Sequence, residues 1–537
     1  MDKKQTKYIF VLGGVMSGLG KGIAAASIGY LLKQAGVKVT IMKLDPYLNV
    51  DPGTMNPYQH GEVFVLDDGS ETDLDLGHYE RFIDVNMTKN NNATSGQIYS
   101  TVLEKERKGE YLGDTVQVIP HVTDEIKNRI RKLNNDGNYE VVICEVGGTV
   151  GDIESLPFME AIRQLSLEVG YHNHMLVHVT LLPFIKASGE LKSKPTQHSV
   201  MKLREIGLSP DMILCRSEHA IEQSVRDKIA LFCNVRSDHV IEGRDVPSIY
   251  EVPLVMHEQN AGHLIKERLK IKKTPKLKKL RSFIENYKNP KNQVTIAMCG
   301  KYTELIDSYK SVMESFVHAG VENNARVNIK WVKTEKIKSN VSAEKEFDGV
   351  DGILLLPGFG SRGVEGKVRS SKYARDTNTP FLGICLGLQC AVIDYARNVC
   401  GLTDANSTEF NKKTKHAVID LMESQKAIKI KGGTMRLGAY DCDILPGTKI
   451  FKAYRKDKIS ERHRHRFEVN NKYKKILEKN GLTFSGVNSD LGVVEAIEIS
   501  DHPWYVASQF HPELKSRVNK AHPLFRDFIK ATIKNKS

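Results

Sequence analysis

The stretch Pro380-Phe-Leu-Gly383-Ile-Cys385-Leu-Gly387-Leu-Gln-Cys-Ala-Val-Ile393 joins a short apolar strand to an apolar helix through a turn that carries a thiol. Glycines two residues before and two residues after Cys385 permit the sharp bend that lifts a nucleophile out of a strand–turn–helix unit. A sulfur at a helix N-terminus is favoured as the thiolate by the helix dipole and by free N–H groups. Taken alone, the stretch fits a buried core cysteine equally well, so the rest of the chain must decide.

Length and composition indicate a globular protein of more than one domain. The chain has 537 residues, which is more than one hydrophobic core supports, and its 40% hydrophobic and 27% charged content is ordinary. Its eight cysteines include no C-x-x-C pair, which disfavours a zinc knuckle or a disulfide scaffold and suits a reducing compartment. No apolar run is long enough for a signal-peptide core or a membrane span. We therefore expect a cytoplasmic protein without a membrane partner.

The formal charge of +13 is concentrated in one stretch of the chain. Residues 266–292 contain eleven Lys or Arg against two Glu, and their leucines recur at roughly helical spacing around Pro275. Nucleic-acid surfaces usually place aromatic residues among the basic ones, and few aromatics occur in this stretch. The pattern favours a solvated, partly helical linker over a nucleic-acid site, and we expect no specific nucleic-acid partner.

Strand-like and helix-like segments alternate in both halves of the chain. In the first half we expect a helix over 23–35 and strands at 8–12, 37–43, 115–119, 141–144, 175–179 and 212–215. After the basic stretch the pattern restarts, with strands at 293–298, 327–331 and 352–356 and a helix over 309–319. Such alternation predicts α/β domains with parallel sheets that bind ligands at the carboxyl ends of their strands. The boundaries that we predict are a first domain over 1–269, a linker over 270–292 and a second domain over 293–537.

A glycine-rich loop, Gly13-Gly-Val-Met-Ser17-Gly-Leu-Gly20-Lys21-Gly22, follows the first strand and opens the first helix. Its backbone N–H groups suit phosphates, and Lys21 can reach the outer ones. The loop departs from the P-loop pattern G-x-x-x-x-G-K-[ST], because Val15 replaces the first glycine and Gly22 replaces the hydroxyl residue that binds magnesium. Mg²⁺ would then take carboxylate ligands from elsewhere, and the candidates are Asp73, Asp75 and Glu145.

Two further stretches have the composition of ligand loops. Lys192-Ser-Lys194-Pro-Thr-Gln197-His-Ser199 sets two lysines beside amide and hydroxyl donors, which suits phosphates and a polar base. Residues 45–57 form a polar loop directly after a strand that ends near Lys43. Either stretch fits a merely solvated loop as well.

A second pair of motifs decides how Cys385 is interpreted. His511-Pro-Glu513 follows a strand-like run, and its carboxylate can orient the imidazole that activates a thiolate. The loop Pro357-Gly358-Phe-Gly360 can supply backbone N–H donors to an oxyanion. With these partners in the same half of the chain, Cys385 is predicted to be a nucleophile.

These motifs carry a resemblance to known families. Residues 383–389, 511–513 and 357–360 resemble a class I glutamine amidotransferase domain. Longer stretches resemble the CTP synthase family, and they lie at 42–55, 59–65, 71–81, 194–199, 432–438 and 461–470. The similarity extends from about Tyr8 to Phe528 and implies a P-loop-like parallel-sheet amidoligase domain followed by the amidotransferase domain.

The resemblance implies amination of UTP to CTP, driven by ATP and fed by glutamine. In that family ATP phosphorylates O4 of the uracil ring, and ammonia made at the distant thiol displaces the phosphate. Members are inhibited by the product CTP, are activated by GTP and assemble as homotetramers; filament formation is left open. Mg²⁺ is the expected cofactor.

Carried over motif by motif, the resemblance also implies roles for individual residues. Cys385 would form a glutamyl thioester, His511 would be its base and acid, Glu513 would orient His511, and Lys21 and Lys43 would stabilise charge in phosphoryl transfer. ATP would be bound by Gly18, Leu19, Gly20, Lys21, Gly22, Ile23, Asp75, Arg244, Asp245 and Val246, with Mg²⁺ on Asp75 and Glu145. UTP or CTP would contact Ser17, Asp152, Ile153, Glu154, Lys192, Ser193, Lys194, Pro195, Thr196, Gln197 and Lys228. Glutamine would be held by Gly358, Leu386, Gly387, Leu388, Gln389, Glu409 and Arg466.

The chain departs from the family pattern in two places. Pro357 stands where the family usually has a glycine, so the backbone at position 357 has no N–H to donate, although Gly358 keeps its own. The stretch 422–432 is shorter than usual, and His60 is a candidate for lining an ammonia path. Two rival interpretations are another glutamine-fed ATP amidoligase and a non-enzymatic scaffold, filament or RNA-binding protein. The second of these leaves Cys385, His511 and Lys21 without a purpose.

Overall fold

In the computed structural model, which describes residues 5–50, 61–134, 137–301, 306–421 and 435–536, the chain divides into two compact units. The first unit comprises Met1–Pro52 and Asp75–Ile284, and the second comprises Gly53–Leu74 and Glu285–Ser537. The predicted stretch 422–432 and His60 lie outside the described residues.

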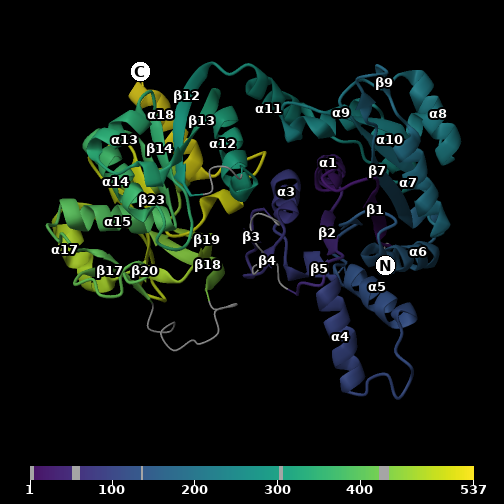
Figure 1. Cartoon of the computed structure of the whole chain (residues 1–537), viewed down its shortest axis with the longest axis horizontal. Helices are drawn as coiled ribbons and strands as arrows, with labels where there is room; N and C mark the ends of the chain where they lie inside the picture. The colour runs from purple at the N-terminus through teal and green to yellow at the C-terminus, as the bar shows by residue number, and fades with distance from the viewer. Residues whose placement is uncertain (1–4, 51–60, 135–136, 302–305, 422–434, 537) are drawn as a thin grey trace. The chain divides into compact units, whose positions relative to one another are not determined.

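The first unit is built on a seven-stranded sheet in which all neighbours are parallel (Figure 1). In spatial order the strands are β11 (Val240–Arg244), β10 (Met212–Ser217), β7 (His174–Leu181), β1 (Lys7–Gly13), β6 (Val141–Val146), β2 (Val39–Asp45) and β5 (Asn92–Thr94). Its helices are α1 (Lys21–Gln34), α3 (Leu74–Ile83), α4 (Ser95–Arg107), α5 (Thr123–Lys132), α6 (Leu156–Val169), α7 (Lys194–Glu205), α8 (Gln223–Cys233), α9 (Val252–Glu258), α10 (Ala261–Arg268) and α11 (Lys278–Lys288). Phe10 and Leu12 of β1 are buried in a cluster with residues of α5 and α6, which explains the uninterrupted apolar run of that strand.

The strand expected at 115–119 is absent from the structure. Val118–Val122 forms a single helical turn before α5, and residues 114–117 have no regular structure. The side chains of Val118 and Ile119 are 44% and 52% exposed, so their apolar character does not reflect burial in a sheet. Pro120, which has no N–H to give to a ladder, directly follows.

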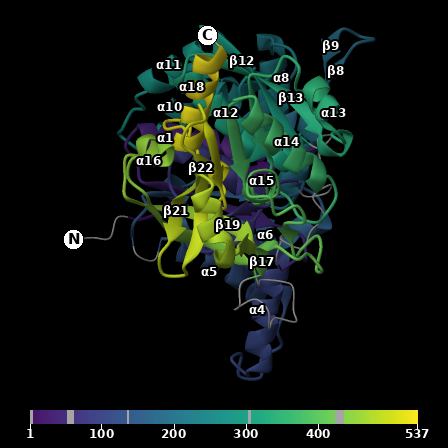
Figure 2. The same ribbon diagram turned by 90° about the vertical axis from the view of Figure 1, so that its left-hand side faces the viewer.

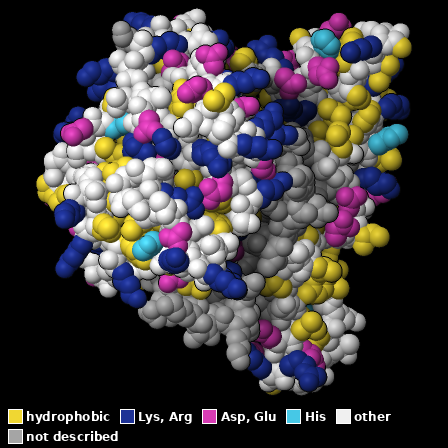
Figure 3. Space-filling view, turned by 60° about the vertical axis from the view of Figure 1, so that its left-hand side comes forward, with side chains coloured by type: hydrophobic (Ala, Val, Ile, Leu, Met, Phe, Trp, Pro, Cys, Tyr) yellow, Lys and Arg dark blue, Asp and Glu magenta, His cyan; other side chains and the backbone are white. Residues whose placement is uncertain are grey.

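The basic stretch is less solvated than expected. Leu280, Phe283 and Ile284 of α11 are buried, and the ring of Phe283 packs edge-on against Tyr250 with centroids 5.5 Å apart. Lysines fill the exposed side of the same helix, which is therefore amphipathic. On the face drawn in Figure 3, basic and acidic side chains are mixed with uncharged surface.

The second unit contains a nine-stranded sheet whose first five strands are parallel and whose remaining neighbours are antiparallel. In order these are β13 (Ala325–Lys333), β12 (Asn292–Gly300), β14 (Gly352–Leu355), β15 (Phe381–Ile384), β23 (Tyr505–Ser508), β22 (Val493–Ile499), β21 (Leu482–Asn488), β18 (Arg436–Ile444) and β19 (Lys458–His465). A small sheet joins β16 (Asn406–Ser407), β17 (Ala417–Leu421) and β20 (Phe467–Val469). The helices are α12 (Lys310–Glu322), α13 (Asn340–Phe347), α14 (Val364–Asp376), α15 (Leu386–Asn398), α16 (Lys449–Tyr454), α17 (Lys474–Lys479) and α18 (Pro523–Lys536).

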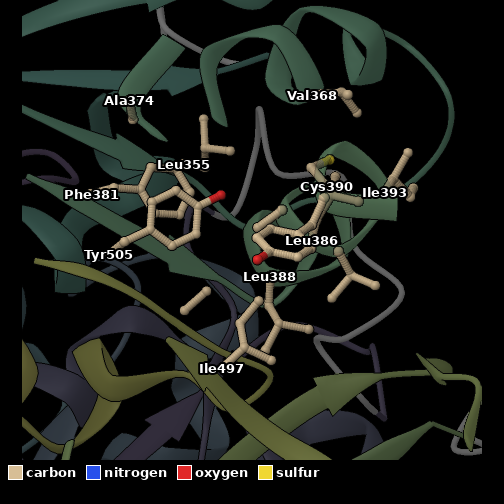
Figure 4. Packing of buried hydrophobic residues seen from close by; sticks show 14 of the residues in the cluster. Leu355, Val368, Ala374, Phe381, Leu386, Leu388, Cys390, Ile393, Ile497 and Tyr505 are labelled. Carbon is tan, nitrogen blue, oxygen red and sulfur yellow. The ribbon is translucent and has the colours of Figure 1, made fainter. Parts of the chain in front are cut away.

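Alternate residues in and directly after β14 pack into two separate hydrophobic cores. Ile353 and Leu355 pack in a cluster with α14 and α15, whereas Leu354 and Leu356 pack in a cluster with α12 and α18. Figure 2 shows α14 and α15 side by side. Figure 4 shows side chains of the first cluster, in which the rings of Phe381 and Tyr505 stack with centroids 4.4 Å apart.

A hairpin from the first half of the chain belongs to the second unit. It pairs β3 (Phe64–Val65) with β4 (Glu71–Thr72), and its turn meets β18, where Ala439 N donates to Asp67 O at 2.9 Å. A Cβ at Gly438, whose φ is +90°, would lie 2.6 Å from the backbone nitrogen of Gly69. The close approach of the two backbones therefore requires glycine at position 438.

Candidate active sites

The Cys385 thiol lies at a sharp bend between a strand and a helix. Cys385 links β15 to α15 with φ +53° and ψ −101°, a backbone conformation that non-glycine residues rarely adopt. A Cβ at Gly383 would lie 2.9 Å from Cβ of Ala507, and one at Gly387 would lie 2.6 Å from the carbonyl oxygen of Leu355. Both predicted glycines are thus required by close packing on either side of the thiol.

His511 and Glu513 form a buried pair beside this thiol. They follow β23, the strand that pairs with β15, and Nδ1 of His511 lies 2.7 Å from Oε1 of Glu513. Burial lowers the pKa of His511, but the Glu513 carboxylate and the neighbouring Cys385 thiol outweigh it and raise this pKa to about 10. The imidazole therefore holds its proton at neutral pH, which favours a thiolate–imidazolium pair.

Cys385 opens into a cavity of about 280 Å³. It is lined by Gly61, Glu62, Val63, Val65, Ser308, Tyr309, Pro357, Gly358, Phe359, Cys385, Arg464, His511, Glu513 and Leu514. The predicted oxyanion loop thus borders the same space as the predicted nucleophile and its base. A cavity of this volume suits a small ligand such as an amino acid, because it lies at the lower end of the range of volumes found for ligand pockets.

The other residues predicted to hold glutamine are not among the residues that line this cavity. Leu386, Gly387, Leu388 and Gln389 form the first turn of α15, and Nε2 of Gln389 donates to Phe467 O at 3.0 Å. Oε1 of Glu409 accepts from Gly360 N at 2.8 Å, which ties that carboxylate to the oxyanion loop. Burial raises the pKa of Glu409, and the Gly360 N–H, Lys301 and Arg466 reduce this rise.

Three polar residues at this site were not predicted from the sequence. Gln509 is fully buried, and its Nε2 lies 3.6 Å from Sγ of Cys385 while its Oε1 accepts from Gln389. Lys301 and Lys367 donate to backbone carbonyls of the loop 356–360. The position of Gln509 two residues before His511 is a signal that sequence reading could have used. Nothing in the sequence distinguishes the two lysines from surface lysines.

One wall of the cavity comes from the β3–β4 hairpin. Ser311 N donates to both carboxylate oxygens of Glu62 at 3.1 Å. Arg462 Nε lies 2.5 Å from Oδ1 of Asp67, and Arg464 Nε lies 2.7 Å from Oε1 of Glu71. Arg462 and Arg464 therefore hold the hairpin in place, a function that the sequence did not predict for them.

In the first unit, the predicted phosphate loop runs from β1 into α1. Gly20 is the residue before the helix and has φ +82°, while Ser17 and Gly18 are exposed at the tip of the loop. Lys21 is buried, and its Nζ donates to Gly148 O at 2.8 Å. The backbone of Gly14 packs against Ser199 in the middle of α7, since a Cβ there would collide with the Ser199 side chain.

A buried charge cluster lies at the carboxyl ends of β2 and β6. Lys43 Nζ lies 2.8 Å from Oε1 of Glu145 and also contacts Asp75 in the first turn of α3. Tyr79, which was not predicted, donates to the second oxygen of Glu145. Burial lowers the pKa of Lys43, but Asp75 and Glu145 outweigh it and hold this pKa well above its usual range.

The donor set at this cluster fits Mg²⁺. The carboxylates of Asp75 and Glu145 both contact Nζ of Lys43. A Cβ at Gly22 would lie 2.1 Å from the Asp75 carboxylate, so this carboxylate can approach the phosphate loop only because residue 22 is glycine. Among the described residues there is no cluster of three or more His, Cys, Asp or Glu side chains that could hold a metal. Mg²⁺ is commonly held by one or two carboxylates together with substrate phosphates, so this pair suffices.

The residues predicted to contact UTP or CTP are only partly brought together. Ser193 precedes α7, and Lys194 to Gln197 form its first turn, in which Gln197 Nε2 donates to Ser193 Oγ at 2.9 Å. The loop 147–152 lies beside the phosphate loop, because Val150 N donates to Gly13 O at 2.8 Å, and Asp152 to Glu154 follow it. Lys192 pairs with Glu190 and is the main reason why the pKa of the Glu190 carboxyl is lowered. Lys228, an exposed residue of α8, lowers this pKa further by a smaller amount.

The predicted adenine contacts lie at the end of β11. Arg244 is the last residue of that strand, and Asp245 and Val246 follow it. Asp245 pairs with Arg216 at the end of the neighbouring strand β10. These side chains thus share the carboxyl edge of the sheet with the phosphate loop, as expected for a parallel α/β sheet.

Comparisons with known proteins match the two halves of the chain to two families. Residues 7–271 match the family described as CTP synthase N-terminus, and residues 304–531 match class-I glutamine amidotransferase. The chain is 58% identical over 528 residues to the CTP synthase of Caldanaerobacter subterraneus subsp. tengcongensis, with 98% of each chain covered. The chain belongs to the CTP synthase family. A second relative, the CTP synthase of Carboxydothermus hydrogenoformans, is 56% identical over 530 residues, covering 98% of this chain and 99% of that one.

The family membership confirms the resemblance and the α/β fold class. As in other CTP synthases, the chain is an ATP-dependent ligase that hydrolyses glutamine, with UTP, ATP and glutamine as substrates. A solved structure described as the glutaminase domain of Trypanosoma brucei CTPS with bound acivicin is 39% identical, covering 45% of this chain and 94% of that chain with a TM-score of 0.43. Among the described helices, none combines the length and apolar content needed to cross a bilayer.

Proposed function

We propose that Cys385 is the nucleophile that releases ammonia from glutamine and that the Lys43–Asp75–Glu145 cluster belongs to a separate site where UTP is phosphorylated and aminated. The observation that carries the proposal is the buried His511–Glu513 pair beside a thiol held at a strand–helix bend. A core cysteine has no need of a strained backbone or a protonated imidazole at its side.

The proposed glutaminase reaction uses the groups that line the cavity. The Cys385 thiolate attacks the side-chain amide carbon of glutamine, and the protonated His511 gives its proton to the departing nitrogen, which leaves as ammonia. His511 then takes a proton from water, which attacks the thioester and releases glutamate together with the thiolate. The N–H groups of Gly358 and of Leu386, the residue after the nucleophile, are the proposed donors to the oxyanion.

The proposed amination site uses the carboxyl edge of the first sheet. The phosphate loop from Gly18 to Ile23 binds ATP, and Lys21 and Lys43 stabilise the charge that develops as the terminal phosphate passes to O4 of UTP. Mg²⁺, held by Asp75 and Glu145, supplies charge neutralisation for the phosphates when bound. Ammonia then adds at C4, and phosphate leaves to give CTP.

We propose further properties on the basis of membership in the CTP synthase family. Ser17, Asp152–Glu154, 192–197 and Lys228 bind the triphosphate of UTP and of CTP, so the product inhibits the enzyme in competition with its substrate. GTP activates glutamine use, and the enzyme works as a cytoplasmic homotetramer in pyrimidine nucleotide biosynthesis.

One assay with two nitrogen sources tests the proposal. Purified protein receives UTP, ATP and Mg²⁺ with either glutamine or ammonium chloride, and CTP is measured by its absorbance change. We expect Cys385→Ala to abolish CTP formation from glutamine and to leave formation from ammonium intact. Equal loss from both sources would contradict the two-site proposal, and retained glutamine use would contradict the role of Cys385.

A further inference from the structure

Lys367 is a lysine buried in the second unit. It lies in α14, its side chain is 0% exposed, and Nζ donates to the carbonyl oxygen of Leu356. Among the described residues no carboxylate forms an ion pair with it. Burial lowers the pKa of Lys367 to about 8; Cys390, Cys299 and Cys385 act against this effect, and the charge of Lys301 adds to it. Because a buried ammonium is costly, a single bond to one carbonyl calls for an explanation.

Lys301 acts on the other end of the same loop. It follows β12, is 9% exposed, and its Nζ lies 2.5 Å from the carbonyl oxygens of both Phe359 and Gly360. The Gly360 N–H is fixed in turn by Glu409 at 2.8 Å. At the start of the loop, Leu356 N donates to Cys299 O at 3.1 Å. The segment from Leu356 to Gly360 is thus held at both ends.

The middle of this loop keeps its N–H groups available. Pro357 has no N–H and a restricted φ, which limits the conformations of the loop further. In the described part of the chain, the backbone N–H groups of Gly358 and Phe359 have no hydrogen-bond partner. Both residues line the cavity that contains Cys385. The lysines therefore engage carbonyl groups of the loop, and the loop borders the cavity that contains Cys385.

We propose that Lys367 and Lys301 are positioning residues of the glutaminase site, which fix the loop Leu356–Gly360 so that the Gly358 N–H meets the oxyanion formed on glutamine. The inference rests on the proposed roles of Cys385 and Gly358. Neither lysine touches the substrate; each acts through a carbonyl group of the loop. A glycine at position 357 would make this loop flexible. In this chain Pro357 and the two lysines restrict the loop instead.

The test removes each ammonium while keeping the length of the side chain. Lys367→Met and Lys301→Met are compared with Lys372→Met, a lysine on the same helix whose Nζ pairs with Asp376 at the surface. Three quantities are measured: glutamine-dependent kcat and KM, ammonium-dependent CTP formation, and the rate at which iodoacetamide alkylates Cys385. Alkylation requires the thiolate but no oxyanion donor, so it separates the two functions.

We expect glutamine-dependent kcat to fall about 10- to 100-fold in both variants, which is less than the loss seen when an oxyanion donor is removed outright. KM, alkylation rate and ammonium-dependent activity should stay within about twofold of the Lys372→Met control, since they do not depend on oxyanion donors. The aldehyde analogue of glutamine adds a direct readout, because its adduct with Cys385 carries the same tetrahedral oxygen. Its inhibition constant should rise by the factor by which kcat falls.

Unchanged kcat in both variants would overturn the inference, and so would an inhibition constant for the aldehyde that stays constant while kcat falls. A parallel loss of alkylation or of ammonium-dependent activity would show general disruption instead, which also contradicts a positioning role. If Lys367→Met does not fold, Lys301→Met decides by the same criteria. Failure of the proposed function itself is distinguishable, because then the unaltered chain would lack glutamine-dependent activity or Cys385→Ala would retain it.

Discussion

Nδ1 of His511 lies 2.7 Å from Oε1 of Glu513, and this buried pair holds a proton on the imidazole beside Cys385. Burial lowers the pKa of His511, yet the carboxylate and the thiol raise it to about 10. The contact between His511 and Glu513 has two functions. It orients the imidazole towards the thiol, and it sets the pH range in which the imidazole can protonate a leaving group.

We expect Glu513→Gln to lower glutamine-dependent kcat by about 10²-fold or more, because the imidazole loses both its orientation and the charge that favours its protonated form. Ammonium-dependent CTP formation should persist. Glu344→Gln, an exposed carboxylate of α13, serves as the control. Loss of both activities in Glu513→Gln would indicate misfolding rather than a catalytic effect.

The same pair predicts a pH dependence of stability. The imidazole binds its proton up to about pH 10 in the folded chain but only to about pH 6.5 when unfolded. The stability gained from the pair is therefore complete below pH 6.5 and is lost as the pH rises to about 10. The Tm difference between the unaltered chain and Glu513→Gln should accordingly shrink between pH 7 and pH 10. A difference that grows over this range would contradict the raised pKa.

Gln509 offers a hydrogen bond to the sulfur of Cys385, with Nε2 and Sγ 3.6 Å apart. Because its other amide atom accepts from Gln389, the NH₂ group is directed at the sulfur. A donor to the sulfur stabilises the thiolate that attacks, so Gln509→Leu should slow the alkylation of Cys385 by iodoacetamide about tenfold. Gln223→Leu, at an exposed position of α8, is the matched control. An unchanged alkylation rate would exclude this contribution.

The close packing of the elbow makes Gly387 intolerant of a side chain. A Cβ there would lie 2.6 Å from the carbonyl oxygen of Leu355, which belongs to the neighbouring strand. Gly387→Ala should cost about 1–3 kcal/mol of stability, because backbone must move to relieve the contact. Gly262→Ala in α10 meets only an ordinary contact at 3.5 Å and is the control. Thermal unfolding followed by circular dichroism compares the two, and equal Tm values would contradict the expected clash with Leu355.

Asp75→Asn and Glu145→Gln should stop CTP formation from glutamine and from ammonium alike, by about 10²-fold or more, since charge neutralisation in phosphoryl transfer is lost. The alkylation rate of Cys385 should not change, because the thiol site is separate. Glu160→Gln, a carboxylate of α6 that pairs with Arg163, is the control. CTP formation that survives in both variants would contradict the assignment of this cluster.

Local sequence patterns were enough to predict most of the strands and which polar residues lie at their ends. The elbow around Cys385, the loop before α1 and the carboxylates near Lys43 all combine a strand end with residues of one chemical type, which short-range reading can detect. The strand expected at 115–119 was wrong, because apolar residues there are exposed rather than buried. Lys301, Lys367 and Tyr79 were missed because their roles depend on tertiary contacts with residues distant in sequence.

The β3–β4 hairpin changes what a glutaminase fragment of this chain must contain. A fragment that starts at Glu285 would include Cys385, His511 and Glu513 but would lack Asp67 and Glu71, the partners of Arg462 and Arg464. Two arginines would lose their carboxylate partners, and the cavity would lose the wall formed by residues 61–65. An independently expressed glutaminase would therefore be assembled from two stretches of the gene, with residues 61–72 fused by a designed linker to the segment from 285 onward.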